Sequence, residues 1–131
     1  MTEKILCVDD EANVLAGLQR SLRKQFQLET APGGEAALAM LEKGGAFAVI
    51  VSDMRMPGLN GLQLLQRVKQ RWPDTVRVML TGNADQQTAM DAVNEGSIFR
   101  FLTKPCPPEH LVAAMQAGAE QHRLVTAERV L

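Results

Sequence analysis

The stretch Ala48-Val49-Ile50-Val51-Ser52-Asp53 joins four consecutive apolar residues to a terminal acid. An apolar run without polar alternation is typical of a strand that is covered on both faces, as strands are in a parallel sheet. Met56-Pro57-Gly58 follows as a turn signal, and Leu62, Leu65 and Val68 then recur at helical spacing. The segment predicts a buried strand, a loop that begins at the acid, and an amphipathic helix.

The same unit recurs along the chain on both sides of this segment. Further apolar runs predict strands at residues 4–8, 28–31, 76–80 and 99–102. Helical patterns are expected at residues 11 to about 25, at 36–42, around 89–93 and from about 109 onward. Regular alternation of strand and helix favours right-handed crossovers and a parallel sheet with helices on both faces. We therefore expect an α/β fold, a three-layer sandwich of five strands and five helices.

Composition excludes several classes of protein. A chain of 131 residues with 46% hydrophobic residues can form one compact core. With 14 basic and 15 acidic residues it has no broad positive surface, so we expect no direct binding to nucleic acid. No apolar run approaches the roughly 20 residues that span a bilayer, and the first ten residues lack a secretory apolar core. We expect a cytoplasmic protein with no membrane segment, in which Cys7 and Cys106 are reduced thiols.

Polar residues follow four of the predicted strands. Asp9 and Asp10 follow the first strand, Asp53 the third, Thr81 the fourth and Lys104 the fifth. The carboxyl ends of parallel strands meet at one edge of the sheet, where open α/β sheets bind their ligands. Three carboxylates would repel one another without a cation, and a hard oxygen-rich site suits magnesium (Mg2+). The sequence therefore predicts a magnesium site at this edge.

The same residues suit a phosphoryl transfer. Asp53 can act as a carboxylate nucleophile and form a mixed anhydride with a phosphoryl group. Mg2+, the Lys104 ammonium and the Thr81 hydroxyl can neutralise or bind the phosphoryl oxygens. No general base is required, and His110 and His122 lie in the last predicted helix, away from the acids.

Four motifs occur in a fixed order. They are Val8-Asp9-Asp10-Glu11, Ser52-Asp53-Met54-Arg55-Met56-Pro57-Gly58-Leu59-Asn60-Gly61, Leu80-Thr81-Gly82 and Phe101-Leu102-Thr103-Lys104-Pro105. Together they resemble receiver domains of bacterial two-component response regulators, and the resemblance covers Lys4 to about Gly118. It implies a flavodoxin-like, doubly wound sheet of strand order 2-1-3-4-5.

The resemblance assigns roles to the acids. It implies that Asp53 is the phosphorylation site, that Asp10 binds Mg2+ directly and that Asp9 orients metal-bound water. The backbone carbonyl of Arg55 should supply a further metal ligand. Arg55 is unusual at its position, and we expect its side chain, together with Asn83, to tune the lifetime of the phosphoryl group.

The resemblance also assigns the switch residues. Thr81 should bond the phosphoryl group and move toward it, Lys104 should pair with it, and Pro105 should follow a cis peptide bond. Phe101 stands at the aromatic switch position, where a hydroxyl is absent because the chain has no tyrosine. It is either a switch or an ordinary core aromatic residue. Gly82 should leave room beside the phosphoryl group.

The implied function is a phosphoacceptor switch. The donor would be a sensor histidine kinase or a phosphotransfer protein, and the domain would catalyse only its own phosphorylation and dephosphorylation, so it is not an enzyme in the usual sense. The segments 80–85 and 94–105 look like receivers that precede HD-type phosphodiesterase domains. The output could equally be a cyclase, a kinase or a DNA-binding domain.

The last helix should continue past the length that covers the sheet, with Leu124, Ala127 and Leu131 at helical spacing. We expect a receiver domain at residues 1–118 and a helical extension at 119–131. The chain would then be cut from a longer protein, and the extension would be a linker to a missing output domain that could also form a homodimer. The alternative is a frayed terminal helix.

Three other functions are weaker. A phosphatase of the haloacid dehalogenase type needs an acid two residues after its nucleophile, where this chain has Arg55. A flavin-binding module needs a phosphate loop rich in Ser, Thr and Gly, in place of Asp9-Asp10-Glu11. A receiver fold that only docks proteins would not need the full set of acids, threonine and lysine.

Overall fold

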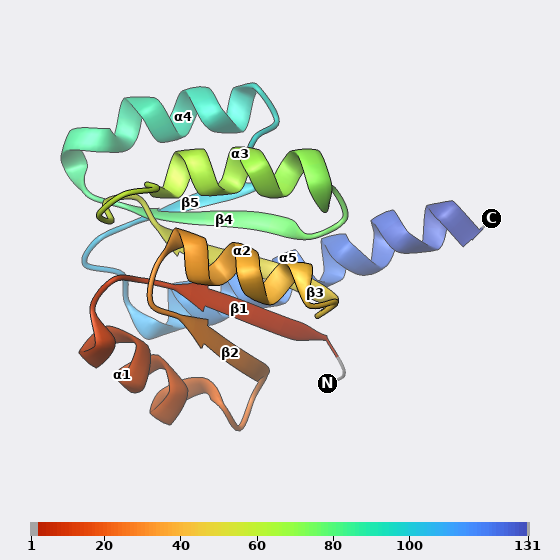
Figure 1. Ribbon diagram of the computed structural model, residues 1–131, viewed down its shortest axis with the longest axis horizontal. Helices are drawn as coiled ribbons and strands as arrows, with labels where there is room; N and C mark the ends of the chain where they lie inside the picture. Colours follow the sequence, from red (N-terminus) through yellow and green to blue (C-terminus); the bar gives the residue numbers. More distant parts are fainter. Residues whose placement is uncertain (1–2, 131) are drawn as a thin grey trace.

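Five parallel strands form the centre of the computed structural model, which describes residues 3–130 (Figure 1). The strands are β1 (Lys4–Val8), β2 (Gln27–Ala31), β3 (Phe47–Asp53), β4 (Val76–Thr81) and β5 (Arg100–Thr103). Their order is β2-β1-β3-β4-β5 and every adjacent pair is parallel. The expected order 2-1-3-4-5 is confirmed.

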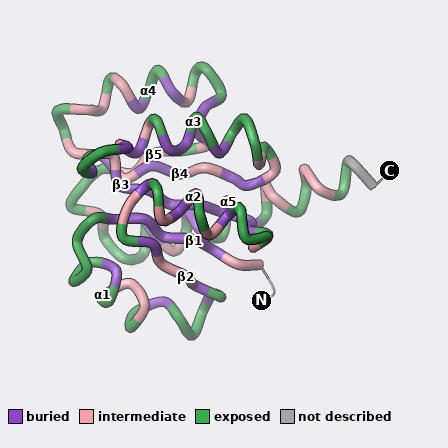
Figure 2. The backbone as a smooth tube through the Cα atoms, viewed as in Figure 1, coloured by how far each residue is buried: buried purple, intermediate pink, exposed green. Residues whose placement is uncertain are grey.

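β3 is the central strand, and all seven of its residues are buried (Figure 2). Its side chains alternate between two apolar clusters, since Ile50 belongs to the cluster on one face and Val49 and Val51 to that on the other. A strand packed on both faces has no solvated side, and this explains the unbroken apolar run in the sequence.

Helices cover both faces of the sheet (Figure 1). They are α1 (Ala12–Leu22), α2 (Gly34–Glu42), α3 (Gly61–Arg71), α4 (Gln86–Asn94) and α5 (Pro108–Val130), with a short 3-10 turn, η1 (Asn83–Asp85), before α4. Leu41, Leu64 and Ala89 pack α2, α3 and α4 into one cluster. Leu15 and Met115 pack α1 and α5 into the other. This is the three-layer sandwich that the alternation predicts.

α1 is shorter than predicted. It ends at Leu22, whereas the apolar spacing allowed a helix to about Gln25. The backbone N–H groups of Gln25 and Phe26 both donate to the Leu22 carbonyl, at 3.0 and 3.1 Å, and this turn buries the Phe26 ring ahead of β2. Val14, expected on the apolar face, is 39% exposed, so the buried stripe of α1 is narrower than the sequence suggests.

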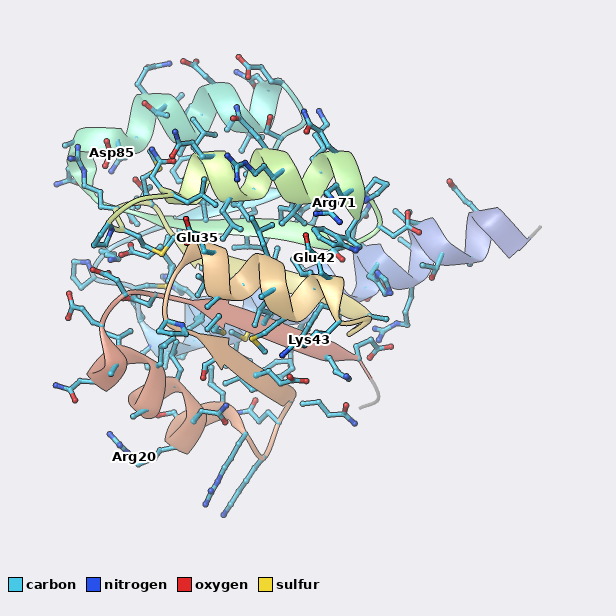
Figure 3. All side chains as sticks on the ribbon, in the orientation of Figure 1. Arg20, Glu35, Glu42, Lys43, Arg71 and Asp85 are labelled. Atoms are coloured by element: carbon cyan, nitrogen blue, oxygen red, sulfur yellow. The ribbon has the colours of Figure 1, made fainter. Side chains whose placement is uncertain are left out.

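Other bounds shift by one or two residues. α2 begins at Gly34 rather than Ala36, and β5 spans Arg100–Thr103 rather than 99–102. Phe99 instead precedes the strand and donates its N–H to the Arg77 carbonyl at 2.7 Å. Between helices, the Glu42 carboxylate of α2 pairs with Arg71 of α3 at 2.5 Å (Figure 3).

α5 runs beyond the sheet as a single helix (Figure 1). Ala119 is fully buried in the core, the His122 Nδ1 atom lies 2.8 Å from the Asp74 carbonyl, and Arg123 pairs with Glu3 at 3.0 Å. Leu124 is 58% exposed, and Leu131 lies outside the described residues. Among residues 3–130, no helix combines the length and apolar character that crossing a bilayer requires.

Candidate functional site

The carboxyl ends of the strands bring the predicted site residues together. Asp53 is the last residue of β3 and Thr81 the last of β4, while Asp9 and Asp10 follow β1. Lys104 follows β5, and its backbone N–H donates to the Thr81 carbonyl at 2.9 Å. The order of the sheet therefore places β1, β3 and β4 side by side, with their polar ends at one edge.

The three acids form one cluster. Single carboxylate oxygens of Asp9, Asp10 and Asp53 all lie within 4.8 Å of one another. Asp9 and Asp53 are buried, whereas Asp10 is exposed. Such a set of hard oxygen donors fits Mg2+, which is usually bound through one or a few carboxylates while it keeps several waters. The donor set thus agrees with the predicted metal.

The surroundings of Asp9 disfavour the charged form of its carboxyl. Burial raises the pKa of its carboxyl, and the nearby Asp53 raises it further, although the Glu11 N–H donates to Asp9 Oδ1 at 2.9 Å and lowers it. Burial and like charges disfavour a carboxylate, while a hydrogen bond to it favours the charged form. A cation bound among the three acids would offset this cost.

Lys104 supplies one cation. Its Nζ atom lies 2.5 Å from Asp53 Oδ1, with side chains 45% and 8% exposed respectively. The peptide bond that follows, between Lys104 and Pro105, is cis. Thr81 is fully buried, and its hydroxyl donates to the Gly82 carbonyl at 3.2 Å. No atom lies within 4 Å of the place where a Cβ on Gly82 would sit, so the site is open on that side.

The loop after Asp53 folds tightly against the strand. The Met54 N–H donates to the Leu80 carbonyl at 2.9 Å, and the Gly61 N–H donates to the Met54 carbonyl at 2.8 Å. A Cβ on Gly61 would lie 2.2 Å from the Asp53 carbonyl oxygen, so only glycine allows this approach. Asn60 then caps α3 in a capping box with Gln63. These contacts fix the backbone that carries Asp53.

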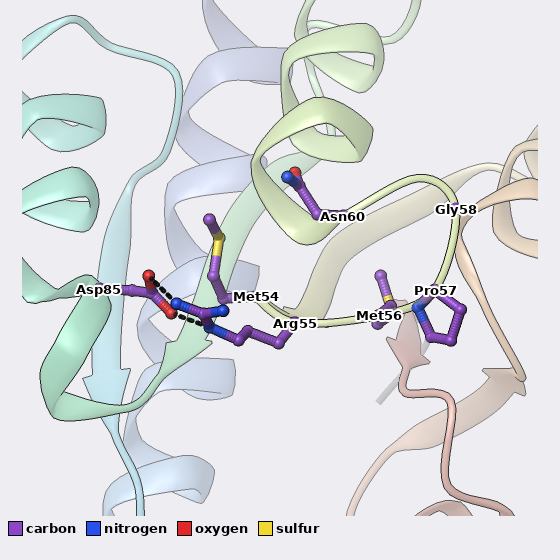
Figure 4. Close-up of a pocket in the computed structure, with 7 residues that line it drawn as sticks. All are labelled: Met54, Arg55, Met56, Pro57, Gly58, Asn60 and Asp85. Atoms are coloured by element: carbon purple, nitrogen blue, oxygen red, sulfur yellow. Dashed lines mark hydrogen bonds and ion pairs between the residues drawn. The ribbon is translucent and has the colours of Figure 1, made fainter.

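The side chain of Arg55 has a partner that the sequence did not predict. Its guanidinium binds both carboxylate oxygens of Asp85, at 2.8 and 3.0 Å, across the hollow drawn in Figure 4. The ion pair raises the pKa of Arg55 further. The sequence does mark Asp85 as a candidate partner for a cation near the site, because it is the first acid after the loop that follows Thr81. The spacing of 30 residues gave no reason to pair it with Arg55.

Phe101 and the histidines lie outside the acidic cluster. Phe101 is half-buried, is paired in register with Met79 and packs against the apolar cluster of α2, α3 and α4. His110 is exposed near the start of α5, and His122 bonds the Asp74 backbone. Both cysteines are free, and burial raises the pKa of the Cys7 thiol to about 12.

A family model described as response regulator receiver domain matches residues 5–116. Among curated proteins, the chain is 35% identical over 120 residues to the hydrogenase transcriptional regulatory protein HoxA of Cupriavidus necator, covering 92% of this chain and 25% of that protein. It is 33% identical to the transcriptional regulatory protein FixJ of Bradyrhizobium diazoefficiens, covering 92% of this chain and 60% of FixJ. The chain thus spans about a quarter of the length of the first curated relatives.

Solved structures agree with this match. A crystal structure described as adenylate cyclase from Rhodopirellula baltica superposes with a TM-score of 0.96 at 46% identity, covering 98% of this chain and 96% of that one. The receiver domain of an HD domain-containing protein from Pseudomonas fluorescens Pf-5 superposes with a TM-score of 0.85 at 31% identity, covering 94% and 98%.

Proposed function

This chain belongs to the response regulator receiver domain family of two-component systems, and we propose that its Asp53 accepts a phosphoryl group from a sensor histidine kinase or a phosphotransfer protein. The observation that carries this proposal is the setting of Asp53. Its carboxylate is buried, lies in a cluster with Asp9 and Asp10, and is paired with Lys104 at 2.5 Å. A carboxylate in such a site can act as a nucleophile that is shielded from bulk water.

We assign the metal site to the carboxylates of Asp9, Asp10 and Asp53 and to the backbone carbonyl of Arg55. Mg2+ bound there would neutralise charge that develops on the transferred phosphoryl group. The mutual distances of the acids and the raised pKa of Asp9 support this assignment. Asp9 would act mainly on metal-bound water, because the Glu11 N–H already occupies one of its oxygens.

Side chains of this chain would carry out the attack on phosphorus and bind the transferred phosphoryl group. An Asp53 carboxylate oxygen attacks phosphorus, the new O–P bond forms, and the bond from phosphorus to the donor histidine nitrogen breaks. The donor leaves as neutral imidazole when the other nitrogen of its phosphorylated ring carries a proton. Lys104 already pairs with Asp53, and after the transfer its ammonium would pair with the negatively charged phosphoryl oxygens. The Thr81 hydroxyl, now bonded to Gly82, would turn to donate to a phosphoryl oxygen.

The signal would leave through the face formed by α4, β5 and α5, where Phe101 is the aromatic residue assigned to the switch. We assign residues 1–118 to the receiver and 119–131 to a helical linker, which could also join two copies of the chain. The protein is then a signalling domain, rather than an enzyme that turns over another molecule. Its free cysteines favour a cytoplasmic location.

The descriptions of similar solved chains suggest two of the output classes that this receiver could regulate. The similar solved chains come from a protein described as an adenylate cyclase and from an HD domain-containing protein. Either output would be regulated by phosphorylation of Asp53 and would not need this chain to touch nucleic acid. Of the weaker alternatives, the haloacid dehalogenase class is disfavoured because Arg55, which stands in place of its second acid, is bound to Asp85.

The test is intact mass after incubation with acetyl phosphate and Mg2+. We expect a gain of one phosphoryl group that is lost in Asp53→Asn and in a sample with chelator. The Asp10→Asn variant serves as a second control, since it keeps the nucleophile and removes a metal ligand. A folded wild-type protein that gains no phosphoryl group would leave either a docking role for this fold or a very short-lived phosphoryl state.

A further inference from the structure

The ion pair between Arg55 and Asp85 joins two segments that flank the proposed phosphorylation site. Arg55 lies in the loop between β3 and α3, and Asp85 lies at the end of η1 (Figure 4). The pair is bidentate, with Nε to Oδ2 at 2.8 Å and Nη2 to Oδ1 at 3.0 Å. The Arg55 side chain is 76% exposed and that of Asp85 only 14%. The carboxylate is thus largely shielded from solvent, while most of the Arg55 side chain is exposed to it.

Asp85 also occupies the N-cap position of α4, yet its side chain makes no capping hydrogen bond. An aspartate at an N-cap ordinarily accepts a hydrogen bond from a backbone N–H of the first helical turn. Asn60 does so at the start of α3, where its backbone is extended at φ −80° and ψ 173°. Asp85 has φ −111° and ψ 10° instead, and it is the last residue of the tight turn η1.

The Asp85 carboxylate therefore has two possible arrangements, which differ in the backbone at residue 85: the present φ −111° and ψ 10°, or the extended backbone of a capping residue such as Asn60. It can bind the Arg55 guanidinium, as it does here, or it can turn back and cap α4 as Asn60 caps α3. Loss of Arg55 as a partner would free it for the second arrangement. An element with two such arrangements can be biased by a change of charge nearby.

Phosphorylation would supply that change. Arg55 is two residues beyond Asp53, and the acyl phosphate would carry more negative charge than the carboxylate it replaces. The Lys104 ammonium is already paired with Asp53, and the Arg55 guanidinium is a further cation, carried by the loop that follows Asp53. Arginine suits a phosphoryl group as well as a carboxylate, because its planar fork can bind either through two nitrogens.

We propose that the Arg55–Asp85 pair is a latch that holds the start of α4 in its resting conformation. A phosphoryl group on Asp53 draws Arg55 away, and Asp85 then becomes the N-cap of α4. The opening step rests on the proposed function. The resting latch does not, because it is a property of the unmodified protein.

The resting latch is tested without phosphorylation by NMR of the unmodified protein. In Arg55→Gln we expect the backbone chemical shifts at residue 85 to move toward values for extended backbone, as the freed carboxylate caps α4. In Arg55→Gln with Asp85→Ala, which has no capping side chain, that shift should be absent. Unchanged shifts at residue 85 in Arg55→Gln would overturn the latch.

The opening step is tested with beryllium fluoride and Mg2+ as a phosphoryl mimic. Asp85→Asn keeps the shape and the capping ability of the side chain but removes its charge. Since exposed ion pairs are individually weak, we expect Asp85→Asn to bind the mimic about two- to fivefold more tightly than wild type. In the Arg55→Gln background the same substitution should change nothing, because the latch is already open.

The outcomes distinguish failure of the opening step from failure of the phosphoacceptor function. An equal effect of Asp85→Asn with and without Arg55, or no effect in either background, would contradict the opening step. A wild-type protein that binds no mimic at all would contradict the phosphoacceptor function, and the NMR shifts at residue 85 would still decide the resting latch.

Discussion

Asp9 and Asp10 are adjacent in the sequence but differ in their exposure to solvent. Asp9 is buried beside Asp53, whereas Asp10 is exposed at the rim of the same cluster. Burial and the charge of Asp53 raise the pKa of Asp9. In the absence of metal, the ionised Asp9 side chain therefore opposes folding at neutral pH.

This reasoning gives a prediction for Asp9→Asn. We expect the substitution to raise the free energy of unfolding of the metal-free protein by about 0.5–2 kcal/mol at neutral pH. Because the folded state binds the Asp9 proton more tightly than the unfolded state, the contribution of Asp9 to stability falls as pH rises above the ordinary range of aspartate. The gain from Asp9→Asn should therefore shrink as pH is lowered through that range. Urea unfolding at several pH values, with chelator present, measures it.

Asp10→Asn is the matched control, and its effect on metal-free stability should be smaller because its carboxylate is already solvated. Added Mg2+ should stabilise the wild type, by about 2.7 kcal/mol at a hundredfold excess over the dissociation constant, and should stabilise both variants less. Equal stabilisation of all three proteins by Mg2+ would contradict the metal assignment.

At the scale of elements, the loop between β3 and α3 depends on a glycine. A Cβ on Gly61 would lie 2.2 Å from the Asp53 carbonyl oxygen and 2.8 Å from Met54 Cα, and backbone atoms cannot give way as flexible side chains do. Gly82, by contrast, has no atom within 4 Å of the same position. The two glycines lie in the same region, next to the acidic cluster, and only one is required by contact.

We predict that Gly61→Ala lowers the free energy of unfolding by about 2–3 kcal/mol, since the backbone next to Asp53 must shift. Gly82→Ala should change it by less than about 0.5 kcal/mol. Denaturant unfolding of the two variants measures the difference. A neutral Gly61→Ala would mean that the close approach of the α3 start to Asp53 is not needed.

Local sequence patterns predicted the elements well and their long-range contacts poorly. The strands and the convergence of Asp53, Thr81 and Lys104 follow from periodicity and the geometry of parallel sheets. The contact between Gly61 and Asp53 and the pair between Arg55 and Asp85 do not. Each depends on how a loop folds onto a segment elsewhere, which no spacing encodes. The end of α1 at Leu22 similarly depends on the need to bury Phe26.

At the scale of the whole molecule, α5 is the element that begins in the proposed switch surface and continues past the end of the sheet. Its packing does not stop at Gly118, because Ala119 is fully buried and polar contacts from His122 and Arg123 tie the next turn to Asp74 and Glu3. These contacts lie away from the strand ends that carry the acids (Figure 1). Stability and phosphorylation should therefore respond differently to shortening the helix.

We predict that a chain ending at residue 118 is less stable than one ending at residue 126 by about 1–2 kcal/mol. The shorter chain loses the buried Ala119 methyl group and the polar contacts of the following turn. Both chains should still gain one phosphoryl group from acetyl phosphate and Mg2+, because the acidic cluster keeps all of its residues. Thermal unfolding and intact mass measure the two properties on the same samples. If the shorter chain stayed folded but took up no phosphoryl group, residues 119–126 would have to act on the site itself, and the division into receiver and linker at residue 118 would fail.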